Sequence, residues 1–168
     1  MNKAERLLNK KWGFFTRGHD FVEMGGIKWA TCNIGAEKPT DYGRYIQWKD
    51  AEDMVHSQWG GKWRLPTSND FRTLLHSDII HRWKVNYHGS GINGVIFYDG
   101  DNELFFPASG HCDSYNKRIF GEETSGYYWS RDFSNEQGTD LSFIEQSVLG
   151  IYNDNKRLGF SVRPILKI

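Results

Sequence analysis

The sequence predicts one α+β domain with few short helices, several short antiparallel strands and long loops. Three observations predict it. The 168 residues fit a single domain of ordinary size. The 18 glycines against only 4 prolines indicate many tight turns rather than a rigid linker. Most segments alternate apolar and polar side chains over short stretches, as half-buried strands do, and few show helical spacing.

The domain is predicted at 20–168, after an N-terminal appendage at 1–19. Leu7 and Leu8 predict a short basic helix within the appendage that ends near Gly13. This segment lacks the apolar stretch of ~7 residues that a secretory signal needs. We therefore expect an intracellular or phage-borne protein, or a leader that precedes this chain. No apolar run approaches the ~20 residues of a membrane-spanning helix, so no membrane insertion is expected.

The first elements are a hairpin and a short strand. Residues 21–24 and 27–32 alternate in hydropathy on either side of Gly25 and Gly26. Two glycines supply the positive φ angles of a primed two-residue turn, which predicts a β-hairpin. Residues 44–48 alternate again and predict another strand.

Two helices are expected in the middle of the chain. A short helix is predicted over 50–56, with Asp50 as its cap. Thr67 and Asp70 match the capping-box pattern and predict a helix over 68–76. The segment before that helix is expected to be anchored by Trp63 and Arg64. The apolar residues of the second helix fall on one face: Phe71, Leu74 and Leu75.

The remaining elements are strands separated by turns and one long loop. The loop is predicted over 109–126, and turns are predicted at 89–94 and 99–102. The expected strands are 83–87, 95–98, 103–106, 127–129, 141–145, 148–152 and 159–165.

Two motifs resemble ligand sites, but their contexts favour turns. Residues 89–94 match G-x-G-x-x-G, yet a strand rather than the required helix is predicted to follow, so no cofactor is expected. Asp99, Asp101 and Glu103 alternate across a turn, but Leu104 stands where an EF-hand loop needs glycine. The six histidines form no H-E-x-x-H motif, and two cysteines are too few for a closed zinc site. No metal is therefore expected.

Net charge and cysteine content further limit the classes of protein that the sequence fits. Lys and Arg number 21 and Asp and Glu number 21, so the net charge is zero. Nucleic-acid binders usually carry a basic excess, and no nucleic-acid partner is expected. A disulfide between Cys32 and Cys112 would add ~4 kcal/mol of stability. A chain of this length does not need one, so two free thiols are favoured.

The aromatic side chains, 7 Trp, 8 Tyr and 11 Phe, have two interpretations. Five tryptophans in strands or tight loops are most simply core residues: Trp29, Trp48, Trp63, Trp83 and Trp129. Four rings in or beside polar segments suit either a recognition surface or the core. They are Tyr115, Phe120, Phe133 and Tyr152. A glycosidase pair drawn from Glu122, Glu123 and Asp132 stays open as an alternative, because spatial separation defines such pairs.

Six blocks of sequence, taken in order, resemble the Fibrobacter succinogenes major paralogous domain family over about residues 20–166. They are Phe21-Val22-Glu23-Met24-Gly25 with Ile27-Lys28-Trp29-Ala30-Thr31-Cys32-Asn33-Ile34-Gly35-Ala36; Asp41-Tyr42-Gly43 with Tyr45 and Trp48; Trp63-Arg64-Leu65-Pro66-Thr67; Phe105-Phe106-Pro107-Ala108-Ser109-Gly110; Gly126-Tyr127-Tyr128-Trp129-Ser130; and Gly159-Phe160-Ser161-Val162-Arg163-Pro164.

The resemblance implies a C-type-lectin-like fold, of the branch shared with formylglycine-generating enzymes. Family members look like secreted or cell-surface modules, common in gut Bacteroidetes, without established catalysis. Some similar proteins are variable targets of diversity-generating retroelements, and their varied positions correspond to 131–158 here. The lectin motifs Glu-Pro-Asn and Trp-Asn-Asp are absent, so Ca²⁺-dependent sugar binding is not implied. Neither Cys32 nor Cys112 lies in the C-terminal region where formylglycine-generating enzymes keep their reactive pair, which argues against that chemistry.

Together these observations predict a non-catalytic binding or adhesion module that recognises a protein or a glycan. The alternatives are a retroelement-diversified receptor-binding protein and a carbohydrate-active enzyme. Arg163, in an otherwise apolar strand, is expected to pair internally. The predicted ligand-binding residues combine ring faces with hydrogen-bonding groups near loop tips. They are Arg131, Asp132, Phe133, Asn135, Gln137, Tyr152, Asn153 and Asn155.

Overall fold

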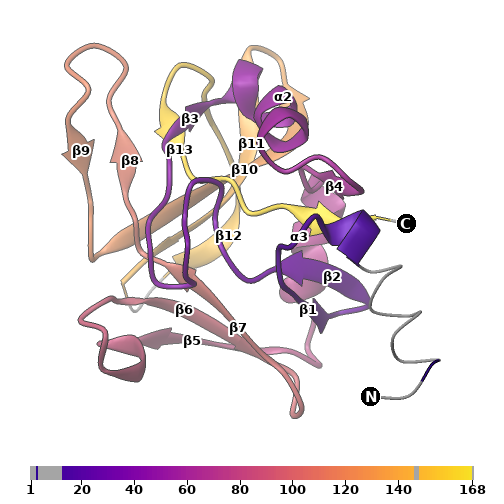
Figure 1. Ribbon diagram of the computed structural model, residues 1–168. Helices are drawn as coiled ribbons and strands as arrows, with labels where there is room; N and C mark the ends of the chain where they lie inside the picture. The colour runs from indigo at the N-terminus through magenta and orange to yellow at the C-terminus, as the bar shows by residue number, and fades with distance from the viewer. Residues whose placement is uncertain (1–2, 4–12, 146–147, 168) are drawn as a thin grey trace.

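The computed structural model describes residue 3 and residues 13–145 and 148–167. In this part of the chain the fold is α+β, with few short helices and four small antiparallel sheets, none of which closes into a barrel (Figure 1). The α+β class predicted from the sequence is therefore confirmed. No helix within the described ranges is long and apolar enough to cross a membrane.

The predicted N-terminal hairpin is confirmed as β1 (Phe21–Met24) and β2 (Ile27–Ala30), which pair antiparallel. Gly25 and Gly26 join the strands with φ angles of 62° and 78°, the positive values that a primed turn requires. The sheet continues in the order β1-β2-β14-β4, so the end of the chain returns beside its beginning. The added strands are β4 (Trp63–Arg64) and β14 (Ile165–Leu166).

Helix α2 (Trp48–Gln58) begins earlier than predicted, and Asp50 lies in its first turn rather than at its cap. The residue before the helix makes no side-chain capping bond. The strand predicted at 44–48 is reduced to β3 (Ile46–Gln47). The indole of the first helical residue donates a hydrogen bond of 3.0 Å to the carbonyl of Ser130. Because this long-range contact holds the indole, tertiary structure rather than a local cap sets the start of the helix.

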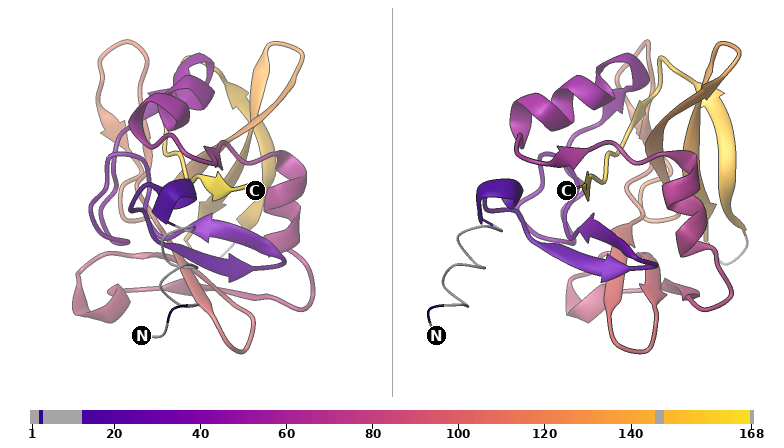
Figure 2. Two further views of the ribbon diagram at one scale, coloured as in Figure 1. Left: turned by 45° about the vertical axis from the view of Figure 1, so that its right-hand side comes forward. Right: turned by 90° about the vertical axis from the view of Figure 1, so that its right-hand side faces the viewer.

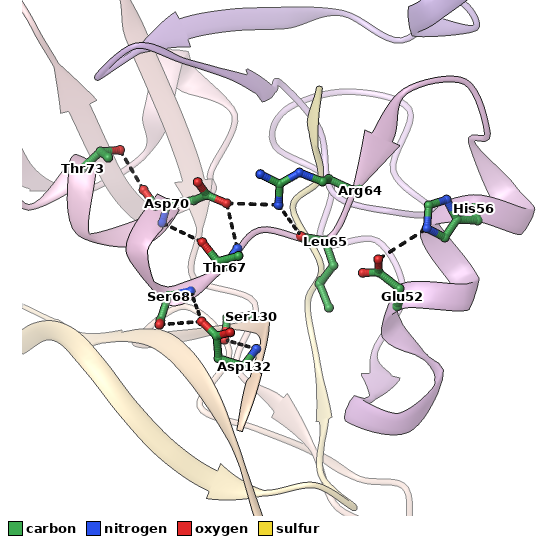
Figure 3. A network of polar contacts seen from close by, with 10 residues as sticks. All are labelled: Glu52, His56, Arg64, Leu65, Thr67, Ser68, Asp70, Thr73, Ser130 and Asp132. Carbon is green, nitrogen blue, oxygen red and sulfur yellow. Dashed lines mark hydrogen bonds and ion pairs between the residues drawn. The ribbon is translucent and has the colours of Figure 1, made fainter. Parts of the chain in front are cut away.

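Helix α3 (Ser68–Leu74) carries the capping box that the sequence predicted. The Thr67 hydroxyl accepts from the Asp70 N–H at 3.1 Å, and the Asp70 carboxylate accepts from the Thr67 N–H at 2.8 Å. The Arg64 guanidinium lies 3.2 Å from the same carboxylate, which anchors the preceding segment (Figure 3). The helix ends before the predicted His76, because the N–H of its C-cap residue bonds carbonyls only two and three residues back.

A second sheet, in the order β5-β6-β7, contains the predicted hairpin across 99–102. The Asp99 carboxylate closes that turn by accepting from two backbone N–H groups at 2.7 and 2.9 Å. The glycine-rich segment 89–94 leads into a strand, as predicted, and the strand predicted at 83–87 starts and ends earlier than expected. The bounds are β5 (Ile80–Lys84), a 3₁₀ turn η1 (Tyr87–Gly89), β6 (Gly94–Tyr98) and β7 (Glu103–Pro107).

The long loop predicted over 109–126 is wrong in part. It contains a hairpin of β8 (His111–Cys112) and β9 (Ile119–Phe120), which projects at the upper left of Figure 1. These strands join a sheet of order β3-β13-β8-β9, in which β13 is Gly159–Phe160. A strand of two residues is too short to show an alternating pattern of apolar and polar side chains. Such a strand forms because of its hydrogen bonds to the neighbouring strand, which the sequence does not reveal.

The last sheet, in the order β10-β11-β12, is longer than the sequence predicted. Polar residues around 131–137 and 153–155 continue its strands, and the β11–β12 pairing runs unbroken from Gln137 opposite Asn155 to Ile144 opposite Val148. Helix α2 lies beside the end of this sheet where β10 turns into β11 (Figures 1 and 2). The strands are β10 (Ser125–Ser134), β11 (Gln137–Ile144) and β12 (Val148–Asn155).

Two clusters of buried apolar side chains form the core. Trp29, Trp63 and Trp129 are buried as predicted, whereas Trp48 and Trp83 are only half-buried. Arg163 is fully buried and donates hydrogen bonds of 2.8–3.2 Å, so the predicted internal pairing is confirmed. Its acceptors are the Asn33 side chain and the backbone carbonyls of Ala30 and Phe105.

Residues 13–19 of the predicted appendage pack against the domain. The Trp63 indole donates to the Thr16 carbonyl at 2.7 Å, and His19 stacks on Trp59 with ring centroids 3.7 Å apart. The helix predicted around Leu7 and Leu8 lies outside the described residues. Both cysteines, Cys32 and Cys112, are free and half-buried, which confirms the expected thiols.

Candidate functional site

All eight predicted ligand-binding residues lie on the last sheet. Asn135, with φ of 54°, stands in the two-residue turn that joins β10 to β11. The sequence interpretation assigned these residues to loops, whereas most of their side chains project from paired strands. Asp132 is half-buried, and the other seven are exposed: Arg131, Phe133, Asn135, Gln137, Tyr152, Asn153 and Asn155.

The strand register divides these residues between two faces of the sheet. Successive side chains on a strand point to opposite faces, and residues directly opposite each other share one. Phe133 pairs with Gly138, and Gly138 pairs with Asp154, so these lie on the face that also carries Tyr152. The other face carries Gln137, Asn153 and Asn155 and continues into the core beneath α3. We call the first of these two faces the Asp154 face and the second the α3 face.

Phe133 is an exposed ring that is nevertheless held in place. Its side chain is 62% exposed. The Trp48 ring meets it edge-on with centroids 5.5 Å apart, and the Lys156 ammonium lies 4.3 Å from the Trp48 centroid and 4.6 Å from that of Phe133. A Cβ on Gly138 would come within 2.6 Å of the Trp48 ring and 2.8 Å of the Trp129 ring. The glycine therefore makes room for the indoles that support Phe133.

Asp132 uses its carboxylate inside the molecule. One of its oxygens accepts from the backbone N–H of Ser68 at 2.7 Å and from the Ser68 hydroxyl at 2.6 Å (Figure 3). Ser68 is the first residue of α3, where a backbone N–H has no partner within the helix. The adjacent Arg131 N–H donates to the Pro66 carbonyl at 2.8 Å. These bonds fix the irregular part of β10 against α3, so Asp132 has a positioning role.

Asp140 was missed by the sequence interpretation, and it is the most unusual carboxyl group in the described structure. Its side chain is fully buried, and neither oxygen accepts a hydrogen bond from a donor in the described residues. Burial, then a hydrogen bond to Asp154 and the charge of Asp154, raise the pKa of Asp140 to about 9, against a smaller lowering effect of Ser142. At neutral pH Asp140 is therefore a neutral acid that donates its proton to Asp154.

A hollow opens beside Tyr152, the residue directly opposite Asp140 in the pairing of β11 with β12. Its lining includes Tyr127, Ser142, Tyr152 and Asp154. The Tyr127 ring stacks on Phe160 with centroids 4.9 Å apart. Burial raises the pKa of Tyr127, and the charges of Asp154 and Asp140 act in the same direction. The site thus combines two rings, a hydroxyl and a carboxylate supported by a buried acid.

The sequence contained only a weak indication that Asp140 and Asp154 would lie together. Asp140 and Ser142 alternate with buried Thr139, Leu141 and Phe143. That alternation places both polar side chains on one face, but it does not tell whether solvent or another layer covers that face. The neighbouring Asp154 belongs to the window 131–158, and only the register of β11 with β12 brings it beside Asp140.

The glycosidase pair and the metal site that were considered from the sequence have little support in the structure. Glu122 and Glu123 are exposed in the turn before β10, whereas Asp132 is bonded to α3. No contact of the described residues joins these carboxylates into a pair. Among the described residues, no group of three or more His, Cys, Asp or Glu side chains is placed to hold a metal ion.

Comparisons with known proteins add no assignment. No protein-family model, curated protein or solved structure matches the chain.

Proposed function

We propose that the protein is a non-catalytic binding module that recognises a protein or glycan through the β10–β11 hairpin and β12. The proposal includes a C-type-lectin-like fold and a surface or extracellular location, as the resemblance to the Fibrobacter succinogenes major paralogous domain family implies. The α+β architecture with small antiparallel sheets is compatible with such a fold.

The observation that carries the proposal is the exposed, supported ring of Phe133. An apolar ring that is 62% exposed gains little stability for the fold by its position. The structure nevertheless builds a rigid support for it from Trp48, Lys156 and the space left at Gly138. A ring fixed in advance loses little entropy when it contacts a ligand, which is why aromatic side chains dominate binding surfaces.

The surroundings of Phe133 suit recognition by shape and hydrogen bonds. Asn135 lies in the turn of the same hairpin, and Gln137, Asn153 and Asn155 place amide side chains on the α3 face at the same end of the sheet. Amide side chains donate and accept, so they match the hydroxyls of a sugar or the backbone of a protein. The zero net charge agrees with a surface that does not depend on a long-range field.

A glycan array with paired double variants tests the proposal. A double variant with alanine at Phe133 and Tyr152 should lose the glycan signals that the wild type gives. Its melting temperature should stay within about 4 °C of the wild-type value, since both rings are exposed. The matched control replaces Tyr115 and Phe120, two exposed rings on the β8–β9 hairpin, and should keep the signals. Glycan signals that survive in the first variant would overturn the proposed surface, and a collapse of its stability would assign the two rings to the core.

A second candidate is a retroelement-diversified receptor-binding protein. The observation that favours it is that exposed positions within 131–158 project from strands whose backbone pairing does not depend on their side chains. Such positions tolerate varied residues without loss of the fold. A reverse-transcriptase gene beside the coding sequence, with a near-copy of its 3′ end differing at adenines, is expected. The absence of both features would exclude this candidate.

A further inference from the structure

The hollow lined by Tyr127, Tyr152 and Asp154 has the composition of a site for a small organic cation. Its lining combines the Asp154 carboxyl group with two tyrosines and Ser142. A Cβ on Gly150 would lie 3.1 Å from the Tyr152 ring, so the absence of a side chain at 150 lets that ring lie along the sheet. Tyr127 is held from behind by Phe160 and edge-on by His111, at 4.9 and 5.1 Å between centroids.

No cation of the described chain neutralises this site. The ion pairs of the described residues involve neither Asp140 nor Asp154 at distances up to 4.0 Å. Asp140 is fully buried on the same face, directly opposite Tyr152, and neither of its oxygens accepts from a donor of the described residues. A buried carboxyl without a basic partner is costly to the fold, and such a group is retained most readily where it serves a site.

The same face already shows how the protein holds an ammonium group between rings. The Lys156 ammonium lies between Trp48 and Phe133 at 4.3 and 4.6 Å from their centroids. The chain fills that position with its own side chain. The hollow between Tyr127 and Tyr152 offers two rings and, in addition, a carboxylate, yet it contains no side-chain ammonium of the described residues.

We propose that this hollow binds an alkylammonium group of a ligand, such as a lysine side chain, with Asp154 as its counter-ion and the tyrosine rings as its walls. An ammonium carries three donors, which match the Asp154 carboxylate and the Ser142 hydroxyl. Cation–π attraction to the rings adds to the ion pair. Asp140 is a positioning residue, because it donates its proton to Asp154 and leaves a single negative charge that one ammonium balances. The site shares Tyr152 with the proposed ligand surface, whereas Asp154, Tyr127 and Ser142 lie outside the residues proposed for that surface.

An NMR titration with Nα-acetyl-lysine methylamide tests the site. We expect shifts centred on the Gly150 amide and the rings of Tyr127 and Tyr152, and an affinity at least about tenfold weaker for the Nε-acetylated probe, which has lost the charge. Calcium chloride should leave these resonances unchanged. Equal binding of the two lysine probes, no binding of the charged probe, or shifts by calcium at the same amides would each overturn the proposal.

Paired variants locate the counter-ion. Asp154→Asn should weaken binding of the charged probe about tenfold, whereas Asp101→Asn, an exposed aspartate in the β6–β7 turn, should leave it unchanged. If Asp154→Asn fails to fold, as its melting curve will show, Tyr152→Leu replaces it and should weaken binding about threefold through loss of one ring. Wild-type affinity in a folded Asp154→Asn or Tyr152→Leu variant would overturn the proposal.

Discussion

Replacing Asp140 by asparagine should make the protein more stable, and increasingly so as the pH rises. Asparagine has nearly the same shape, remains uncharged and can donate its N–H to Asp154 as the acid does. The wild-type protein must instead keep a carboxyl group protonated at a pH where the unfolded chain releases the proton. The substitution removes this requirement without emptying the site.

The sign and size of the effect follow from proton linkage. Burial and Asp154 raise the pKa of Asp140 from its ordinary 3.8 to about 9 in the folded state. Its contribution to stability is therefore greatest below pH 3.8 and is lost progressively as the pH rises to about 9. Between these values the folded state holds one more proton than the unfolded state, so the wild-type protein loses ~1.4 kcal/mol per pH unit through this group. From pH 5 to pH 8, the gain of Asp140→Asn over the wild type should grow by about 4 kcal/mol.

Urea unfolding of both proteins at pH 5, 6, 7 and 8 measures this difference. Asp101→Asn serves as the control, because that aspartate is exposed, and its curve should run parallel to the wild type. Parallel curves for Asp140→Asn and the wild type would refute the reasoning, since they would mean that Asp140 ionises in the folded protein as it does in the unfolded chain. The titration of the Asp140 carboxyl carbon by NMR gives an independent check in the unmodified protein.

Three further substitutions test other parts of the structure. Arg163→Met should lower the free energy of unfolding by about 3–5 kcal/mol in a denaturant titration, because it leaves the buried Asn33 side chain and two carbonyls without their donor; a loss below 1 kcal/mol would contradict that role. Thr67→Ala should cost ~1 kcal/mol by removing the cap of α3, and an unchanged melting temperature would show that the capping box is dispensable. Gly138→Ala should cost about 1–3 kcal/mol by displacing Trp48 and Trp129, with the displacement visible in Trp fluorescence; a wild-type spectrum would contradict the close packing.

Much of the first half of the fold could be predicted because its signals are local. The Gly25-Gly26 turn needs positive φ angles that glycine adopts freely, and the capping box of Thr67 and Asp70 is formed within one helical turn. Tertiary contacts overrode weaker local signals elsewhere. The indole of Trp48 donates to the Ser130 carbonyl, and α2 starts ahead of Asp50. The strands β8 and β9 form in a segment that shows no alternation, because they pair with each other and β8 pairs with β13.

The sequence by itself determined the α+β class, the N-terminal hairpin and the start of α3. It also predicted the segment in which we propose the ligand surface. Only the tertiary structure decided how that surface is divided, because the register of β11 with β12 sets which side chains share a face. It separates Phe133 and Tyr152 from Gln137 and Asn155, and it brings Asp154 beside Asp140. A carboxyl group has an ordinary pKa in the unfolded chain. Because the pairing of β11 with β12 places Asp140 beside a second carboxyl group and its side chain is buried, its pKa rises and it stays protonated at neutral pH.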